Sequence, residues 1–448
     1  MSSNTLKEKA IRGTLWTIFG YGTSQVLRFG SNLILTRLLV PELFGLMALV
    51  QIFIRGLTLF SDIGINPSII RSDRGEDPIF LNTAWSIQAV RGFGLWVGCL
   101  IIALPAANYY DDQRLRWLIP VVGFTTIISG FNSTIIPSLN RRMEFRKLAV
   151  FELGIQVVSL IILVTWAWLN PTIWALVGGN LISVALTALI SHKINSGKPN
   201  RFVWDKEAVK EIVSFGKWIF LSTAMTFLAS EADRILLGKF FSLEMLGIYV
   251  IAFTFADIPR QVSLKISSKV IFPAISQLVH VPRKTLNKKI GAKRWGLLLL
   301  IGLIVSSLVC FGDLLVLTLY DSRYEQASWM LPILAIGLWP LLLCITTDRF
   351  LIAIGKPSYL ALGNFLKFLY MVVGIPLGYH SHEILGVIIV IALNDFPYYI
   401  AVNYGLWREK LAFFWQDLQA TLLLIGIIGV TLFIRMRMGY GLPIDSLL

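Results

Sequence analysis

Long apolar blocks alternate with short polar segments along nearly the whole chain. The blocks reach about 20 residues, the length that an α-helix needs to cross roughly 30 Å of hydrocarbon. A membrane β-barrel would instead show shorter segments of alternating hydrophobicity. The pattern therefore predicts an all-α, polytopic membrane protein. We expect thirteen spans, near 14–36, 43–68, 80–106, 117–139, 148–169, 172–192, 212–238, 244–272, 294–320, 328–354, 357–379, 384–404 and 412–434.

The polar segments between these blocks differ in charge. Basic residues collect in alternate segments, above all in 141–147, 193–210 and 283–294. Lys and Arg mark the cytoplasmic loops of multi-pass proteins. We therefore expect a cytoplasmic N-terminus, and the last span would then leave Arg435 and Arg437 outside.

Two short segments suggest an internal repeat. Residues 36–46 read TRLLVPELFGL, and residues 238–248 read GKFFSLEMLGI. The basic, acidic and glycine positions coincide at Arg37/Lys239, Glu42/Glu244 and Gly45/Gly247. Each copy joins the first and second helices of a six-helix set, so both sets have the same orientation. We expect two six-helix bundles related by a parallel repeat, plus one additional C-terminal helix.

Composition narrows the class further. Apolar residues make up 56% of the chain and charged residues only 15%, too few charges to cover soluble domains of this size. The net charge is +14, and the basic residues lie mainly in short loops between apolar blocks. This placement is typical of cytoplasmic loops in a membrane protein rather than of a nucleic-acid binding surface. Cys99, Cys310 and Cys344 lie inside apolar blocks without metal-ligand spacing. We expect packing cysteines, no metal site and no cofactor.

Several segments resemble a known family. They read RLLVPELFGLMALVQIF from Arg37, FSDIGINPSIIR from Phe60, FLNTAWSIQAVRG from Phe80 and ADRILLGKFFSLEMLGIYVIAFTFADIPRQV from Ala232. Together they resemble the lipopolysaccharide-type polysaccharide flippases, which belong to the multidrug/oligosaccharidyl-lipid/polysaccharide exporter superfamily. The resemblance extends from residue 10 to about 405. Members often have twelve or fourteen spans, and our count of thirteen departs from both.

The resemblance implies a transporter in the bacterial cytoplasmic membrane. Such a protein flips undecaprenyl-diphosphate-linked oligosaccharide to the outer leaflet by alternating access, for surface polysaccharide export. Its partners would be the lipid-linked oligosaccharide, membrane lipid and polysaccharide polymerases. Under this reading the chain has an N-terminal six-helix lobe, a cytoplasmic linker, a C-terminal six-helix lobe and a tail with one more helix, at 1–192, 193–210, 211–405 and 406–448.

Charged residues inside the spans are the functional signal. Each costs about 2.5–3.5 kcal/mol at a helix centre on insertion scales, so it should face protein or water. Arg28, Arg55 and Arg91 lie deep in the first three spans, and arginine binds phosphate oxygens in pairs. We expect these three, with Arg260 in the second lobe, to bind the diphosphate. Long stems would let four lysines near span ends reach the interface, namely Lys217, Lys265, Lys269 and Lys367.

Structural pairing is the alternative for each of these arginines. Arg55 and Asp62, seven residues apart, would share a helix face, and Arg91 can meet Asp62 or Glu152. Asp257 and Arg260 have the spacing of an intrahelical pair.

Two further carboxylates precede the second copy of the repeat. Glu231 or Asp233 could bind a coupling proton or sodium ion. Asp233 lies near the outer end of its span, which favours an exposed, solvated carboxylate.

Two other function classes fit less well. A membrane glycosyltransferase or polymerase needs a sizeable outer loop for acid–base chemistry, and the Asp111–Asp112 loop is short; we expect no catalytic residue. A drug or small-molecule exporter of the same superfamily is the main alternative, although deep arginines repel a cationic substrate. A nucleotide-binding GxxxxGK[ST] loop is absent from the sequence.

Overall fold

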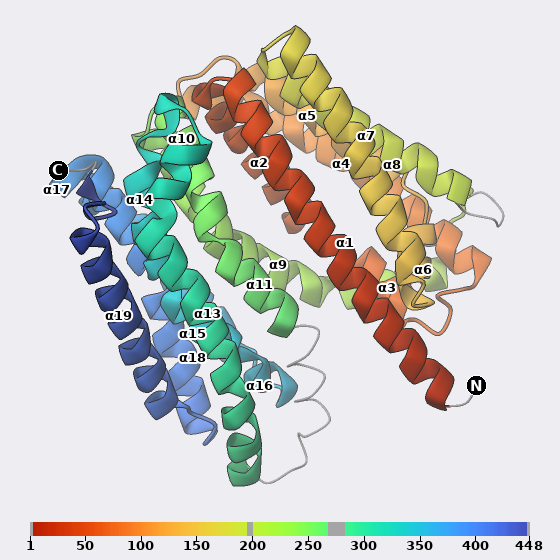
Figure 1. The fold of residues 1–448 in the computed structure, drawn as a ribbon. Coiled ribbons are helices and arrows are strands. Elements are labelled where there is room, and N and C mark those ends of the chain that lie inside the picture. The colour runs from red at the N-terminus through yellow and green to blue at the C-terminus, as the bar shows by residue number, and fades with distance from the viewer. Residues whose placement is uncertain (1–2, 195–199, 268–282, 446–448) are drawn as a thin grey trace. The chain divides into compact units, whose positions relative to one another are not determined.

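The computed structural model describes residues 3–194, 200–267 and 283–445. These residues form helices joined by turns and include no strand (Figure 1). They divide into two compact units, Met1–Ala224 and Met225–Leu448, here called the N-terminal half and the C-terminal half. The all-α, polytopic prediction is confirmed. The lobe and linker boundaries expected from the sequence stay a prediction.

Two expected spans of the N-terminal half are broken helices. The first breaks at Ser61–Gly64, where Gly64 takes a left-handed conformation (φ 64°) that glycine adopts without strain. The second breaks at 131–134, and its two helices are bent by 57°. The helices are α1 (Ser3–Leu38), α2 (Pro41–Phe60), α3 (Ile65–Arg71), α4 (Pro78–Tyr109), α5 (Leu115–Gly130), α6 (Ile135–Arg141), α7 (Phe145–Leu169) and α8 (Ile173–Ile194).

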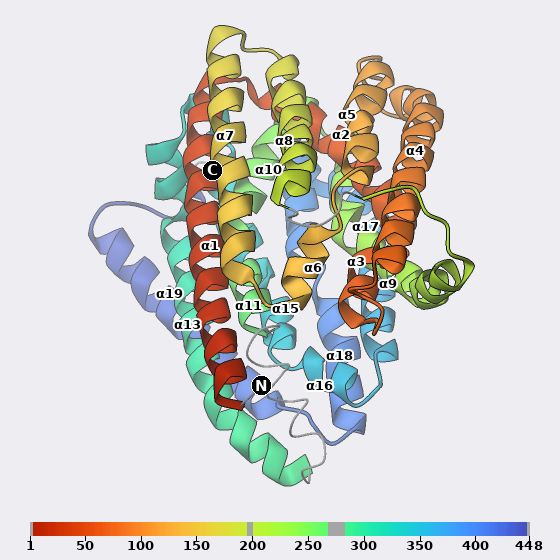
Figure 2. The same cartoon turned by 90° about the vertical axis from the view of Figure 1, so that its right-hand side faces the viewer.

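Packing in the N-terminal half brings distant helices together. α1 lies along α7, and α7 lies along α8 (Figure 2). Leu35 and Leu39 from the end of α1 form a hydrophobic cluster with Ala167 and Ala175 from the α7–α8 corner. α4 packs along α5, and α5 also contacts α8. These helices supply the walls of the cavities described below.

The C-terminal half also contains interrupted helices. α14 and the helices after it are bent by 40°. α17 leaves the helical region at His382 and Glu383, which is where the sequence predicts a boundary between two spans. The helices are α10 (Leu243–Ala256), α11 (Ile258–Ile266), α13 (Arg283–Leu319), α14 (Ala327–Gly337), α15 (Trp339–Ile345), α16 (Asp348–Ala353), α17 (Ser358–Leu393), α18 (Phe396–Arg408) and α19 (Phe414–Arg437).

The helices are long and apolar enough for a multi-pass protein. Among the described residues, seven helices pass a test of length and hydropathy, and nine do so if each bent pair is one span. The end of the expected span 244–272 lies outside the described residues, as does the 195–199 part of the linker. The count of thirteen and the cytoplasmic N-terminus stay predictions. Cys99, Cys310 and Cys344 are buried and free, as expected for packing residues.

The two copies of the proposed repeat occupy equivalent turns. α1 and α2 are joined by Leu39 and Val40, while α9 (Lys206–Phe240) and α10 are joined by Phe241 and Ser242. Each joint has the same length and falls at the same place in its motif. A repeat that relates whole halves stays a prediction.

The described part of the expected linker is docked on the N-terminal half. The Phe202 ring lies 4.8 Å from the Trp85 ring, centroid to centroid. Backbone N–H groups of Val203 and Asp205 donate to the Ser86 and Thr83 hydroxyls of α4 at 3.0 and 3.2 Å. α9 follows at once and runs unbroken across the boundary between the halves at 224–225.

Candidate functional site

A cavity of about 570 Å³, lined by both apolar and polar side chains, lies within the N-terminal half. Residues of α1, α2, α6, α7 and α8 line it, and we call it the α7–α8 cavity. Its hydrophobic side includes Phe151 and Leu163. Its polar side combines one cation, one carboxylate, carboxamides and hydroxyls, namely Arg28, Glu152, Gln51, Gln156, Asn180, Ser159, Ser183 and Thr187.

Two of the predicted substrate arginines lie at or near this cavity. Arg28 of α1 lines it and is exposed, and no ion pair is recorded for Arg28 within the described part of the chain. Arg55 is exposed on α2, one turn beyond the lining residue Gln51 and on the same helix face. Glu152 of α7 shares the cavity with Arg28. The Arg28 guanidinium, which forms no recorded ion pair with a described carboxylate, is thus presented to the cavity.

A second cavity, of about 360 Å³, lies on the other side of Ile136. We call it the α4–α5 cavity because α4 and α5 supply much of its wall. It contains both Arg91 and Asp62. Arg28 and Arg91 therefore line different cavities, and the structure does not bring the three predicted arginines into one lining.

Arg91 holds the end of α2. Its Nη2 donates to the Thr58 carbonyl oxygen at 2.6 Å, and its Nε donates to the Ser61 hydroxyl at 3.0 Å. The last carbonyls of a helix have no partner within the helix, and a cation near them is favourable. Arg91 thus positions the break between α2 and α3, a structural role other than the pairing with Asp62 or Glu152 that the sequence left open.

Asp62 lies beyond the end of α2 rather than on its face. The helix ends at Phe60, and Asp62 Oδ1 accepts a hydrogen bond from the Gly64 N–H at 2.9 Å. The expected shared helix face of Arg55 and Asp62 is therefore wrong, because the chain turns before it reaches Asp62. Asp62 helps to form the turn that leads into α3.

The carboxylates that begin the second repeat copy are buried among partners. Glu231 forms an ion pair with Arg234 at 3.0 Å. Asp233 is 5% exposed, and its Oδ2 accepts a hydrogen bond from the Tyr249 hydroxyl at 2.6 Å. The expectation of an exposed, solvated Asp233 is wrong, because α10 packs Tyr249 against it. A coupling role for either carboxylate stays a prediction.

Arg260 is bound by a neighbouring carboxylate. Its Nε and Nη2 both donate to Asp257, three residues earlier, and Gln261 also donates to that carboxylate, at 3.1 Å. This is the intrahelical pair that the sequence offered as the alternative to substrate contact. Contact of Arg260 with a substrate stays a prediction.

The four lysines expected to reach the interface have different outcomes. Lys367 Nζ lies 2.5 Å from the Asp395 carboxylate, and both side chains are largely buried. That expectation is wrong for Lys367, because a neighbouring helix supplies an anion. Lys265 is exposed on α11. The side chains of Lys217 and Lys269 lie outside the described residues.

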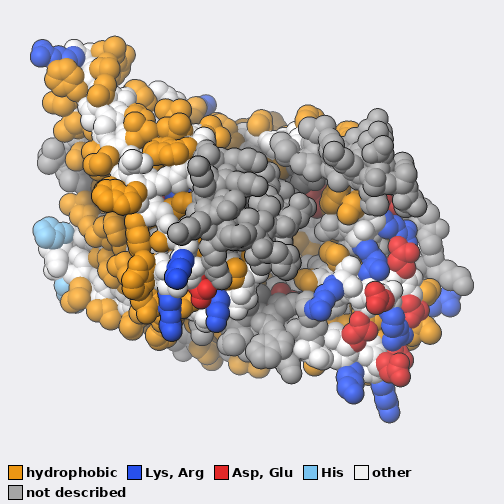
Figure 3. All heavy atoms as spheres, turned by 90° about the horizontal axis from the view of Figure 1, so that it is seen from below, with side chains coloured by type: hydrophobic (Ala, Val, Ile, Leu, Met, Phe, Trp, Pro, Cys, Tyr) orange, Lys and Arg blue, Asp and Glu red, His pale blue; other side chains and the backbone are white. Residues whose placement is uncertain are grey.

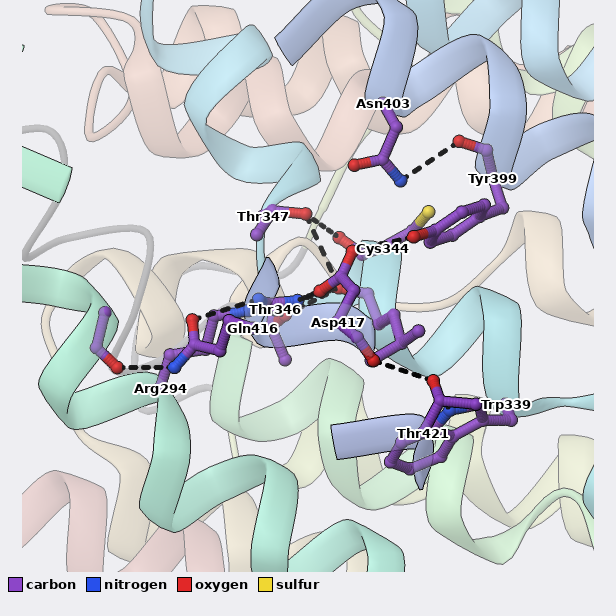
Figure 4. Close-up of polar contacts among 12 residues, drawn as sticks. Arg294, Trp339, Cys344, Thr346, Thr347, Tyr399, Asn403, Gln416, Asp417 and Thr421 are labelled. Carbon is purple, nitrogen blue, oxygen red and sulfur yellow. Dashed lines mark hydrogen bonds and ion pairs between the residues drawn. The ribbon is translucent and has the colours of Figure 1, made fainter. Parts of the chain in front are cut away.

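The most buried charges of the C-terminal half were not identified from the sequence. Arg294 has a side chain that is 1% exposed; it donates to Asp417 at 2.5 Å and to the Thr346 hydroxyl at 2.7 Å (Figure 4). Tyr399 donates to the other Asp417 oxygen at 2.9 Å. These residues come from α13, α18, α19 and the turn after α15, and sequence periodicity relates only residues within one helix.

Arg435 is a second case of this kind. The sequence places it outside the membrane after the last span, but it is buried and donates through both Nη atoms to Asp313 of α13. Arg435 is buried because α19 packs against α13, and the membrane side on which it lies stays a prediction.

Exposed charges gather at the end of the N-terminal half formed by α3 and α6, where basic and acidic side chains interleave (Figure 3). The pairs include Arg142–Glu76 at 3.0 Å and Lys147–Glu144 at 2.5 Å. Such exposed pairs contribute little to stability. Within residues 3–194, 200–267 and 283–445, no group of three His, Cys, Asp or Glu side chains is placed to hold a metal ion.

The sequence of this chain is similar to those of known proteins of polysaccharide biosynthesis. The profile of a family described as "Polysaccharide biosynthesis protein" matches residues 34–329. The succinoglycan biosynthesis transport protein ExoT of Rhizobium meliloti (strain 1021) is 23% identical over 357 residues, which cover 80% of this chain and 72% of ExoT.

Solved structures share the fold at low sequence identity. The lipid II flippase MurJ in an inward closed conformation matches with a TM-score of 0.66 at 11% identity, covering 93% of this chain and 92% of MurJ. An inward-facing multidrug resistance MATE family transporter of the MOP superfamily matches with a TM-score of 0.65 at 15% identity, covering 88% of this chain and 94% of the transporter. The chain therefore belongs to the polysaccharide biosynthesis protein family, and its fold is that of MOP superfamily transporters.

Proposed function

We propose that this protein flips an undecaprenyl-diphosphate-linked oligosaccharide from the inner to the outer leaflet of the bacterial cytoplasmic membrane. The two halves would expose the substrate alternately to the two sides, for surface polysaccharide export. The protein would act without a catalytic residue or cofactor. Its partners would be the lipid-linked oligosaccharide, the surrounding lipid and a polysaccharide polymerase that uses the flipped product.

One observation carries the proposal: Arg28 of the N-terminal half lines a cavity that also contains carboxamides and hydroxyls. A diphosphate needs donors that stay charged, and the guanidinium does so with a planar array of N–H groups. Arg55, exposed one turn from Gln51, supplies a second cation near the same cavity. The described cations Arg260, Arg294, Lys367 and Arg435 of the C-terminal half are instead bound by carboxylates.

The relatives support the substrate class. The matching family is described by polysaccharide biosynthesis, and ExoT is named as a transport protein for succinoglycan biosynthesis. Lipid II, in the name of the structurally similar flippase, is a lipid-linked saccharide. The proposal extends this chemistry to the present chain.

The test uses a host strain that lacks this gene. The gene or its Arg28→Ala and Arg55→Ala variants are returned, and outer-leaflet lipid-linked oligosaccharide is measured with an impermeant sugar-oxidising label. We expect wild type to restore labelling. Arg28→Ala should reduce labelling about tenfold or more, because a hydrogen bond to a charged group contributes roughly 1.5–3 kcal/mol, and Arg55→Ala should reduce it less.

Arg323→Ala is the matched control. This arginine lies in the short 3-10 helix Ser322–Tyr324 of the C-terminal half, where it pairs with Asp321. Labelling should stay at the wild-type level in this variant, at equal protein abundance in the membrane. If the Arg28→Ala variant and the Arg55→Ala variant each restore labelling to the wild-type level, the diphosphate assignment is rejected.

A drug exporter is the second candidate, because the fold is shared with a multidrug resistance transporter. Each cavity also contains a carboxylate, Glu152 or Asp62, that could attract a cationic compound. Efflux of ethidium from cells that express the protein separates the two functions. The flippase proposal expects no efflux above the empty vector.

A further inference from the structure

We propose that the α7–α8 cavity binds the sugar that is attached directly to the diphosphate. The contacts would come from the carboxamides of Gln51 and Asn180 and the hydroxyl of Ser159. This inference rests on the proposed function and assigns the sugar part of the substrate to a place within the N-terminal half.

The first argument is an unsatisfied polar atom. Ser159 is 8% exposed and lines the cavity, and its hydroxyl oxygen has no hydrogen-bond partner. The great majority of buried polar groups in folded proteins have a partner. The carboxamides of Gln51 and Asn180 also line the cavity, and no hydrogen bond of theirs is recorded with the described residues. A ligand that enters the cavity can satisfy all three groups.

The second argument is that the part of α7 that carries Ser159 is held in place. Gln156 and Ser24 bind each other twice, through Ser24 Oγ to Gln156 Oε1 at 2.6 Å and Gln156 Nε2 to Ser24 O at 3.0 Å. This pair ties α7 to α1 at the cavity. Ser159 lies three residues further along α7, close to the same helix face. Its position is therefore set before any ligand binds.

The third argument is the chemistry of the lining. A carboxamide both donates and accepts hydrogen bonds, as does a sugar hydroxyl. A diphosphate only accepts, so it can use the N–H groups of Gln51 and Asn180 but not their carbonyl oxygens, and the Glu152 carboxylate would repel it. Arg28 is the one charged donor in this lining. The phosphate therefore belongs beside Arg28, and the sugar belongs among the uncharged groups.

The neighbouring cavity does not offer the same chemistry. Two threonine hydroxyls of its lining bond to the backbone: Thr125 donates to Val122 O at 2.6 Å, and Thr126 donates to Gly92 O at 3.0 Å. The Gln88 amide donates to backbone carbonyls of the α5–α6 break at 3.0–3.2 Å. Asn132 Oδ1 of this lining is also buried without a hydrogen-bond partner, but Arg91, the arginine of this cavity, is bound to the end of α2. We therefore assign the sugar to the α7–α8 cavity, where Arg28 can hold the diphosphate beside it. Its volume of about 570 Å³ is within the range of small-molecule sites, about 300–1,000 Å³.

The experiment measures binding to the purified full chain in detergent. The probes are undecaprenyl diphosphate, the same lipid carrying a single glucose, galactose or N-acetylglucosamine, and uncharged undecaprenol. Wild type should bind at least one sugar-bearing lipid more tightly than bare undecaprenyl diphosphate. Gln51→Leu and Asn180→Leu should each weaken binding of that lipid about 5- to 10-fold, the effect of one lost hydrogen bond. Binding of the bare lipid should not change.

Ser159→Ala keeps the test independent of folding. Removal of an unpartnered buried hydroxyl should leave the thermal unfolding temperature unchanged or raise it, while binding of the sugar-bearing lipid weakens. Gln113→Leu, a carboxamide change in an exposed turn, is the control and should alter neither. Arg28→Ala should weaken binding of bare undecaprenyl diphosphate and of the sugar-bearing lipids alike.

The outcomes separate the two proposals. Equal weakening of bare and sugar-bearing lipids by the Gln51 and Asn180 variants would overturn the sugar assignment, as would no weakening of either. Wild-type preference for bare undecaprenyl diphosphate over every sugar-bearing lipid would also overturn it. If wild type binds undecaprenol as tightly as it binds the diphosphate lipids, the proposed function itself fails.

Discussion

The two halves of the molecule treat their cations differently. In the C-terminal half, Arg294 and Arg435 are buried against Asp417 and Asp313, and Lys367 is bound to Asp395. In the N-terminal half, Arg28 faces a cavity and Arg55 is exposed, while Arg91 binds neutral oxygens at the end of α2. A cation in an apolar environment needs compensation. Carboxylates of the chain itself compensate these three cations of the C-terminal half, whereas Arg28 of the N-terminal half faces a cavity.

This difference teaches how to sort intramembrane charges. A charge that is already neutralised mainly stabilises the fold, whereas a charge that faces a cavity is available for binding. The distinction predicts that substituting a neutralised cation lowers mainly stability, whereas substituting a cation that faces a cavity lowers mainly transport. We make four predictions of the change in stability and give them from the largest change to the smallest.

The Arg294–Asp417 pair should give the largest change. Arg294→Ala leaves Asp417 buried without its partner, and breaking a buried pair costs about 3–5 kcal/mol. Thermal unfolding of the purified protein in detergent measures this loss. The double variant Arg294→Met/Asp417→Leu should be more stable than Arg294→Ala, because neither charge is left alone. A double variant that is less stable than Arg294→Ala would show that the pair is not the source of the effect.

Arg91 should give an intermediate change. Arg91→Ala removes hydrogen bonds from a charged donor to Thr58 O and the Ser61 hydroxyl, a loss of about 1.5–3 kcal/mol. Both unfolding temperature and export should fall together. An Arg91→Ala protein with unchanged unfolding temperature but no export would instead place Arg91 among the substrate contacts.

Asp77 should give a smaller, pH-dependent change. The N–H of Ile79 donates to Asp77 at the start of α4, and this bond, with help from Arg74, lowers the pKa of the carboxyl below its ordinary value. Its stabilisation is therefore present above the ordinary pKa and is lost as pH falls through the lowered one. Asp77→Ala should cost about 1 kcal/mol at neutral pH. The deficit relative to wild type should shrink in unfolding scans below about pH 4; a constant deficit would contradict this account.

Arg28 should give the smallest change in stability. An exposed side chain away from fixed partners contributes within about 0.5 kcal/mol, so Arg28→Ala should unfold at nearly the wild-type temperature. Loss of export with preserved stability would sharpen the contrast with Arg294→Ala. A large fall in unfolding temperature would place Arg28 with the structural cations of the other half.

Apolar length and local spacing predicted much of the fold. The helices, the boundary near 382–383 and the Asp257–Arg260 pair follow from residues close in sequence. Breaks within spans were missed because the few polar residues in 61–64 and 131–134 are too short an interruption to divide an apolar block of about 20 residues. A hydropathy pattern cannot separate a straight span from a bent one.

Charge partners were harder to predict than helices. Arg294 finds Asp417, and Arg435 finds Asp313, across more than 100 residues, so no helical periodicity relates them. The sequence identified Arg28 and Glu152 as candidates, but it contained no signal for Ser159 or Asn180. Their role depends on which polar atoms remain unpartnered after packing, and that is a property of the folded chain.

The docked segment before α9 has a mechanical consequence. Residues 202–205 lie against α4, and α9 then crosses from one half to the other without a break. A helix rises about 1.5 Å per residue, and the 35 residues of α9 form one element that contributes to both halves. A movement of one half against the other would therefore require α9 to bend, turn or unwind.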